Sequence, residues 1–164
     1  MIALKIEDMK DFVSKLLTHE TFDKFYVGES VIRTSTDFKI GGRLNRDYYS
    51  NDEWEALEGR EYSVWSEVRP LAYQLIKGRK LPVYFQFIFQ LSGENQRWLM
   101  ERNSSLLVKN EDIRGMYLNI RYENGMIQCI TGLSLKTFIP DKTVEHLWDE
   151  TVRQFFRQNQ IAVS

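Results

Sequence analysis

The feature that most constrains the fold of this chain is an order of predicted elements that occurs twice. In the first half, alternation of apolar and polar residues predicts a strand over residues 2–6. Asp8 is expected to cap a helix that ends near His19. Three short strands over residues 25–44, with a turn at Gly28-Glu29-Ser30, and a helix over residues 63–76 complete this half.

The second half is predicted to follow the same order. Its clearest strand covers residues 82–91, where Phe85, Phe87 and Phe89 share one face and Tyr84, Gln86, Ile88 and Gln90 share the other. Ser92 is expected to cap a helix that carries Trp98 and Leu99. A strand over 116–122 leads into Asn124-Gly125, which is the strongest short signal for a hairpin. The remaining predicted elements are strands over 126–131 and 133–138 and a helix over 143–158.

An internal duplication predicts an architecture more firmly than any single motif does. We expect an α+β fold built from pseudo-duplicated β-α-β-β-β(-α) units, with antiparallel sheets and with helices packed on one side. The chain should form a single domain, residues 1–164, made of two similar halves, 1–78 and 81–164. The order of elements does not indicate an activity, because one fold can support many functions.

The composition excludes several classes of protein. Hydrophobic residues make up 43% and charged residues 27%, as in an ordinary globular protein rather than a disordered one. A formal net charge of −1 is unlike that of a dedicated nucleic-acid binder. The single cysteine, Cys129, cannot form an intrachain disulfide and is expected to be a small buried apolar residue. We found no signal peptide and no transmembrane stretch, so we expect a cytoplasmic protein without a membrane partner.

The first candidate site is a long polar segment between the last strand and the final helix of the first half. Long irregular segments often carry function, and arginine and tyrosine are frequent anchors of interfaces. The alternative is a strand end followed by a solvated loop. We expect Gly41-Gly42 to form a strand bend, because this pair lacks the spacing of a phosphate-binding loop. The candidate partner-binding residues of this segment are Arg43, Arg46, Asp47, Tyr48 and Tyr49.

The second candidate site is the densest basic run of the chain, formed by Lys77, Arg79 and Lys80 around Gly78. It could contact phosphate or an acidic partner. A solvated turn after the end of a helix, where cations are favoured, is the alternative. No cluster of histidine, cysteine and acidic residues has metal-ligand spacing, so we predict no metal, no cofactor and no catalytic residue.

Part of the second half resembles the repeating unit of DNA sliding clamps. Leu118 to Gly132 is similar to the apolar hairpin of these proteins, and the strand and helix over residues 2–17 resemble their first two elements. The resemblance implies a DNA-clamp-like fold, and partners would then be needed to close a ring. Over nearly its full length, the chain also resembles an uncharacterised family of short proteins from Firmicutes. Sequence segments such as Gly42-Arg43-Leu44-Asn45 and Glu67-Val68-Arg69-Pro70 carry this resemblance.

The leading hypothesis is therefore a non-enzymatic cytoplasmic binding protein with a clamp-like fold, with a protein or a nucleic acid as its partner. Two alternatives stay open. One is a small enzyme with its site in residues 43–62, and the other is a structural homodimer. A convergence of Arg43, Asp47 and Tyr48 on one pocket would favour the enzyme.

Overall fold

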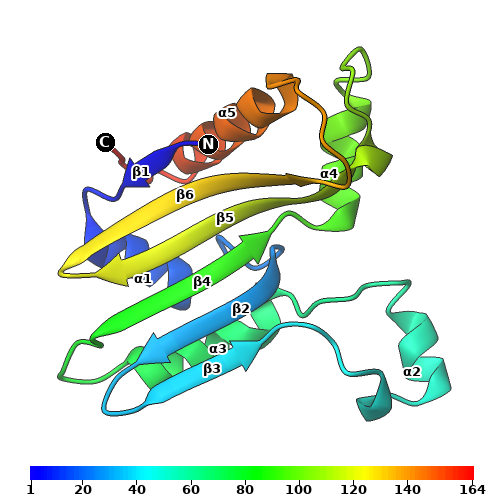
Figure 1. The fold of residues 1–164 in the computed structure, drawn as a ribbon. Coiled ribbons are helices and arrows are strands. Elements are labelled where there is room, and N and C mark those ends of the chain that lie inside the picture. The colour runs from blue at the N-terminus through cyan, green and yellow to red at the C-terminus, as the bar shows by residue number, and fades with distance from the viewer.

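One six-stranded antiparallel sheet forms the centre of the molecule, and its strand order is β1-β6-β5-β4-β2-β3 (Figure 1). The computed structural model describes residues 1–164. The strands are β1 (Ala3–Lys5), β2 (Tyr26–Arg33), β3 (Asp37–Gly41), β4 (Tyr84–Gln90), β5 (Ile113–Glu123) and β6 (Met126–Leu135). The α-helices are α1 (Met9–Leu17), α2 (Asn51–Ala56), α3 (Trp65–Ile76), α4 (Gly93–Glu101) and α5 (Thr143–Gln158). Two 3₁₀ helices, η1 (Arg46–Tyr48) and η2 (Asn110–Asp112), complete the structure.

The sheet is covered on one face only. In β4, Phe85, Phe87 and Phe89 are buried, while the residues between them are half-buried and point to the opposite face. Trp65 of α3 lies 4.9 Å from the ring centres of both Phe87 and Phe89, which places α3 on the buried face. In Figure 1, α1 and α3 lie behind the sheet, so the viewer looks at the face that no helix covers.

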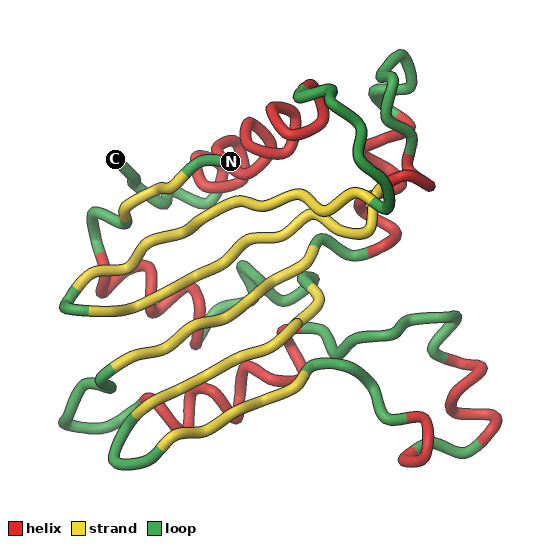
Figure 2. The backbone as a smooth tube through the Cα atoms, viewed as in Figure 1, coloured by secondary structure: helices red, strands yellow, loops and turns green.

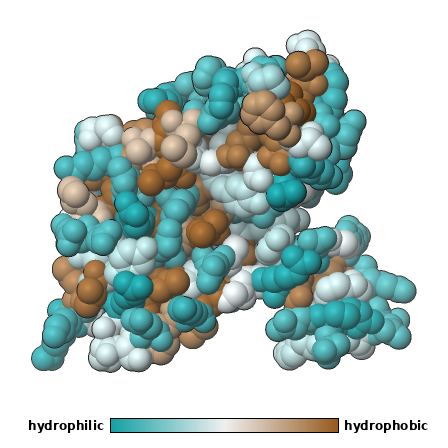
Figure 3. All heavy atoms as spheres, in the orientation of Figure 1, coloured by the Kyte–Doolittle hydropathy of each residue, from teal (hydrophilic) through white to brown (hydrophobic).

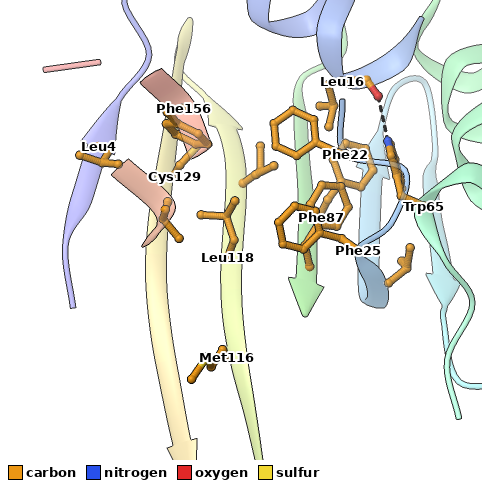
Figure 4. Packing of buried hydrophobic residues seen from close by; sticks show 14 of the residues in the cluster. Leu4, Leu16, Phe22, Phe25, Trp65, Phe87, Met116, Leu118, Cys129 and Phe156 are labelled. Carbon is orange, nitrogen blue, oxygen red and sulfur yellow. Dashed lines mark hydrogen bonds between the residues drawn. The ribbon is translucent and has the colours of Figure 1, made fainter. Parts of the chain in front are cut away.

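The hydrophobic core joins the helices to the buried face of the sheet (Figure 4). Phe12 of α1 packs edge-on against Phe156 of α5, with 6.4 Å between the ring centres. Phe22, in the connection after α1, packs against Phe89 of β4, with 5.7 Å between the ring centres. Residues distant in the sequence therefore share one interior, which is the main source of stability in a chain of this size.

Several sequence predictions are confirmed. Asp8 and Ser92 accept hydrogen bonds from the first turns of α1 and α4, as expected of N-caps. Asn124 and Gly125 both have positive φ angles, of 53° and 73°, and close the tight hairpin between β5 and β6. The helix expected over 143–158 is α5.

Two predicted strand boundaries are wrong. The predicted turn at Gly28-Glu29-Ser30 is a bulge inside the continuous strand β2, where the pairing with β4 shifts between Val27 and Ser30. The predicted strands 126–131 and 133–138 are one strand, β6, whose pairing with β5 runs through Gly132. Apart from the short helix α2, each half therefore has the order β-α-β-β-α, with one strand fewer than predicted.

The strands of the two halves pair differently, so the structure does not show the predicted clamp-like duplication. In the second half, β4 pairs with β5 of the same half. In the first half, β1 does not pair with β2 but lies beside β6, with Leu4 opposite Cys129. The structure shows a single antiparallel sheet to which both halves contribute, and no clamp-like duplication with separate sheets.

Cys129 should be chemically inert in the folded protein. Its side chain is completely buried on the helix-covered face of β6, and this burial raises the pKa of the thiol far above its usual range. We expect no reaction with a water-soluble disulfide reagent under native conditions and one thiol equivalent after unfolding in urea. Rapid labelling of the native protein would show that this part of the core opens.

Candidate functional site

The long polar segment forms a small lobe that projects from the edge of the sheet (Figure 2). We define the lobe as residues 45–60, which contain η1 and α2. A short two-stranded arm connects it to the sheet. In this arm Arg43 forms an antiparallel β-bridge with Tyr62, and the amide of Leu44 donates to the carbonyl of Glu61. In Figure 3 the lobe stands at the lower right, separated from the body by an open gap. No residue of η1 or α2 is buried.

The lobe is held together by its own side chains. The Arg46 guanidinium lies 5.3 Å from the ring centre of Trp54 and donates hydrogen bonds to the carbonyl of Tyr49 and to Asn51. Tyr49 contacts Trp54, with 5.7 Å between ring centres. A side-chain hydrogen bond links the end of the lobe to the body: Arg60 donates to Glu67 of α3 at 2.8 Å. Partial burial of Glu67 acts to raise the pKa of its carboxyl group. Hydrogen bonds from Arg60 and from the Val64 amide outweigh this effect, so the pKa is lowered.

The candidate residues of this segment do not assemble a catalytic site. Arg43 is exposed and pairs with Glu61 at 3.9 Å, whereas Tyr48 is 83% exposed and touches Tyr49. Asp47 is exposed and accepts no hydrogen bond. Five hollows of the surface, with volumes between about 160 and 540 Å³, are lined by other residues. The convergence that would favour an enzyme is not observed.

The basic run lies at the other end of the sheet. Lys77 is the C-cap of α3, and its ammonium group lies 5.7 Å from the ring centre of Tyr73. Arg79 and Lys80 are exposed and form no ion pair. The amide of Val83, just beyond them, donates to the carbonyl of Arg33, the last residue of β2, whereas the lobe joins near Tyr26, the first residue. The two candidate clusters are thus separated by the length of β2.

The uncovered face of the sheet brings together polar side chains that are distant in the sequence. Because register places paired residues on the same face, one row crosses all six strands. We call it the cross-sheet row. From edge to edge it consists of Lys39, Val31, Gln86, Arg121, Gln128 and Lys5. At about 4.8 Å per strand spacing, it spans roughly 24 Å.

Positive charge predominates in this row. Lys5 and Lys39, at its two ends, form no ion pair, although both are exposed. Arg121 lies 3.8 Å from Glu123, and Arg33 in the adjacent row lies 3.7 Å from Asp37. Both of these pairs are solvent-exposed, so each contributes little to stability and can be exchanged for another anion.

Hydrogen-bonded side chains lie in the middle of the face, next to the apolar Ile88 and Ile130. The Tyr84 hydroxyl donates to Oε1 of Gln86 at 3.1 Å, and Nε2 of Gln86 donates to Oδ1 of Asn119 at 3.0 Å. Arg121 donates to Gln128 at 3.4 Å. The Arg33 guanidinium stacks 4.9 Å from the ring centre of Tyr84. The middle of the face therefore offers amide donors and acceptors beside an aromatic ring.

Three tyrosines occupy the end of the face beside the arm of the lobe. Tyr26 stacks on Tyr62, with 6.2 Å between ring centres and planes 29° apart. The Tyr117 ring lies over Gly115, where an added Cβ would come within 2.6 Å of the ring carbon that bears the hydroxyl. Burial, and to a lesser extent the nearby Tyr62, raise the pKa of Tyr117. The Tyr117 hydroxyl therefore stays neutral near pH 7.

The sequence predicts only part of this face. The alternation in β4 indicates that Gln86 shares a face with Tyr84, but nothing in the sequence places Lys5 or Lys39 beside them. Their positions depend on the pairing of β1 with β6 and of β3 with β2. Non-local pairing is the part of a fold that local patterns do not encode.

The fold and the exposed face define a small α+β protein with a one-sided antiparallel sheet. The chain belongs to the family of unknown function DUF5721, whose model matches residues 15–164. No curated protein and no solved structure matches the chain significantly. None of its helices has both the length and the apolar character that a bilayer-spanning segment needs.

Proposed function

We propose that the protein is a binding protein whose uncovered sheet face receives a single-stranded nucleic acid. The observation that carries this proposal is the cross-sheet row, which places Lys39, Arg121 and Lys5 on one surface. Lysines without ion-pair partners bind phosphate groups without the cost of breaking an existing pair. The small net charge of the whole chain hides this local excess, because the lobe carries a compensating group of acids, namely Asp47, Asp52, Glu53, Glu55 and Glu58.

The chemistry of the rest of the face supports the same ligand. Proteins that bind single strands combine a basic track with aromatic rings on which bases stack. Here Tyr84 lies beside the basic row, and the side-chain amides of Gln86 and Asn119 can hydrogen-bond to exposed base edges. A nucleic-acid duplex is a poorer fit, because none of the protein's α-helices presents a basic face next to the row.

The face is a weaker candidate for a sheet-to-sheet protein contact. Such contacts bury continuous apolar faces, whereas here the apolar Ile88 and Ile130 flank the polar Asn119 in one row, and Figure 3 shows apolar and polar residues mixed on this side. Gln86, Asn119 and Gln128 would each lose contact with water under a second sheet. A ligand that carries its own hydrogen-bonding groups avoids this penalty.

The proposal predicts salt-dependent binding that is lost on charge reversal. We expect a fluorescently labelled oligothymidylate of about 12 nucleotides to bind at about 50 mM salt and to weaken steeply by about 200 mM. The double variant Lys5→Glu/Lys39→Glu should bind about tenfold more weakly. The slope of the logarithm of its binding constant against the logarithm of salt concentration should be smaller in magnitude by about 1.4. For a single strand, each lost phosphate contact removes about 0.7 from this slope. Fluorescence anisotropy measures both quantities.

A matched control separates a local site from a general charge effect. The double variant Arg97→Glu/Arg153→Glu changes the net charge equally, but both residues are exposed on helices and form no ion pair. This variant should bind the oligonucleotide nearly as the unmodified protein does. Equal loss in both variants, or no binding by the unmodified protein at low salt, would exclude the proposed site.

A further inference from the structure

A separate cleft lies on the opposite side of the molecule, under the helices. It is about 290 Å³ in volume, and α1, the end of α3 and the start of β4 surround it. In Figure 1, α1 and the end of α3 lie behind the left-hand end of the sheet, where β4 starts. The cleft shares no residue with the cross-sheet row. Its lining is Met9, Lys10, Val13, Ile76, Leu81, Pro82, Phe85, Tyr122 and Ile127.

The interior of the cleft is almost entirely apolar. Phe85 and Tyr122 form its floor, with ring centres 5.2 Å apart and planes nearly parallel at 17°. Leu81 at its rim is 77% exposed, and the adjacent Val83 is 70% exposed. An apolar side chain as exposed as Leu81, at the rim of an apolar cleft, is left without the partner that its chemistry favours.

The rim of the cleft is basic. Lys10 lines it directly, Lys77 follows Ile76, and Arg79 and Lys80 precede Leu81. None of these four cations forms an ion pair. The nearest acids on α1 are already engaged, because Asp8 caps the helix and Asp11 pairs with Lys15 at 2.7 Å. The charges therefore favour an occupant with an anionic end.

We propose that this cleft binds a free medium-chain carboxylate, with its acyl chain between α1 and α3 and its carboxylate at the Lys77–Lys80 turn. If each methylene takes about the 30 Å³ of a water molecule in the liquid, the cleft has room for roughly ten carbons. The basic turn then has a role that does not depend on a nucleic acid. This inference goes beyond the proposed function and uses none of its residues.

A chain-length series measured by calorimetry tests the proposal. Below the concentrations at which they form micelles, straight-chain carboxylates should bind about fourfold more tightly per added methylene, up to about ten carbons. Longer chains should gain nothing, because the cleft is full. Decanol should bind more weakly than decanoate, and Arg79→Glu/Lys80→Glu should weaken decanoate about fivefold while leaving decanol unchanged.

Two variants locate the binding in this cleft. Val13→Phe fills the space beside α1 and should abolish decanoate binding while the circular dichroism spectrum stays native. Leu81→Asp places an acid at the rim without disturbing the core, so it keeps the test valid if the first variant does not fold. Leu107→Asp is the control, because Leu107 is similarly exposed, at 71%, and is not part of the cleft lining.

Three results would overturn the proposal. One is the absence of saturable decanoate binding, and another is binding that Val13→Phe and Leu81→Asp do not affect. The third is association with phosphatidylglycerol vesicles but not with dissolved decanoate, which would assign Leu81 and the basic turn to a membrane surface. Failure of the oligonucleotide experiment would leave this proposal intact, since the two sites have no residue in common.

Discussion

Replacing Gly42 by alanine is expected to destabilise the protein severely, by at least about 3 kcal/mol. A Cβ at this position would overlap the carbonyl group of Val27 and would lie 2.7 Å from the carbonyl oxygen of Gly28. Both obstacles are backbone atoms, which cannot rotate aside. The amide of Gly42 donates to Gly28 at 2.9 Å, and its carbonyl accepts from Ser63 at 2.7 Å, so moving the chain apart breaks both bonds.

The neighbouring glycine provides a matched control. Gly41 precedes Gly42 in the same strand region, but no heavy atom lies within 4 Å of the position that a Cβ would occupy there. Gly41→Ala should change the free energy of unfolding by less than about 0.5 kcal/mol. Urea unfolding followed by circular dichroism compares the two variants. If Gly42→Ala proved as stable as Gly41→Ala, Gly42 could not lie against the backbone of Val27 and Gly28 as it does in the structure.

Local patterns are enough to predict most elements, because their causes are local. The apolar stripe of α5 and the alternation of β4 each arise from burial of one face, and both predict nearly the observed bounds. The Asn124-Gly125 turn is equally predictable, since few other dipeptides accept two positive φ angles. In each case, residues close together in the sequence contain the whole cause of the structure.

The bulge of β2 shows where local chemistry misleads. Gly28-Glu29-Ser30 has the composition of a turn and predicts one. In the structure β2 is paired on both sides, with β3 and with β4, and this pairing keeps the strand continuous through the bulge. Ser30 consequently lies fully buried, and its hydroxyl has no hydrogen-bond partner. Pairing with two neighbouring strands has therefore outweighed the local preference of these residues for a turn.

The candidate sites illustrate the same division between local and non-local information. The Lys77–Lys80 turn is visible in the sequence because its cations are contiguous, and the structure adds the apolar cleft beside it. The cross-sheet row is not visible there, because Lys5 and Gln128 come from opposite ends of the chain. Only the order of strands brings them side by side. The positions of charged residues in the sequence therefore identify the basic turn but not the sheet face.

Trp65→Ala is expected to produce the largest loss of stability among the core substitutions, about 3–5 kcal/mol. Trp65 is fully buried at the start of α3, and its ring lies 4.9 Å from those of Phe87 and Phe89. Its Nε1 also donates to the carbonyl of Leu16 at 2.8 Å, shown as a dashed line in Figure 4. Leu16 lies in the last turn of α1, where carbonyl groups have no partner within the helix. One side chain therefore fixes α1, α3 and β4 together.

Trp65→Phe separates the two contributions of the side chain. Phenylalanine keeps most of the ring contacts but leaves the buried carbonyl of Leu16 without a donor, which should cost about 1–3 kcal/mol. Trp98→Ala is the control for loss of an indole, because Trp98 is 57% exposed on α4 and mainly stacks against Arg102. That variant should lose less than about 1 kcal/mol. Chemical unfolding followed by far-ultraviolet circular dichroism avoids the fluorescence change that removing a tryptophan causes. Equal losses for Trp65→Ala and Trp98→Ala would contradict the position of Trp65 at the junction of these three elements.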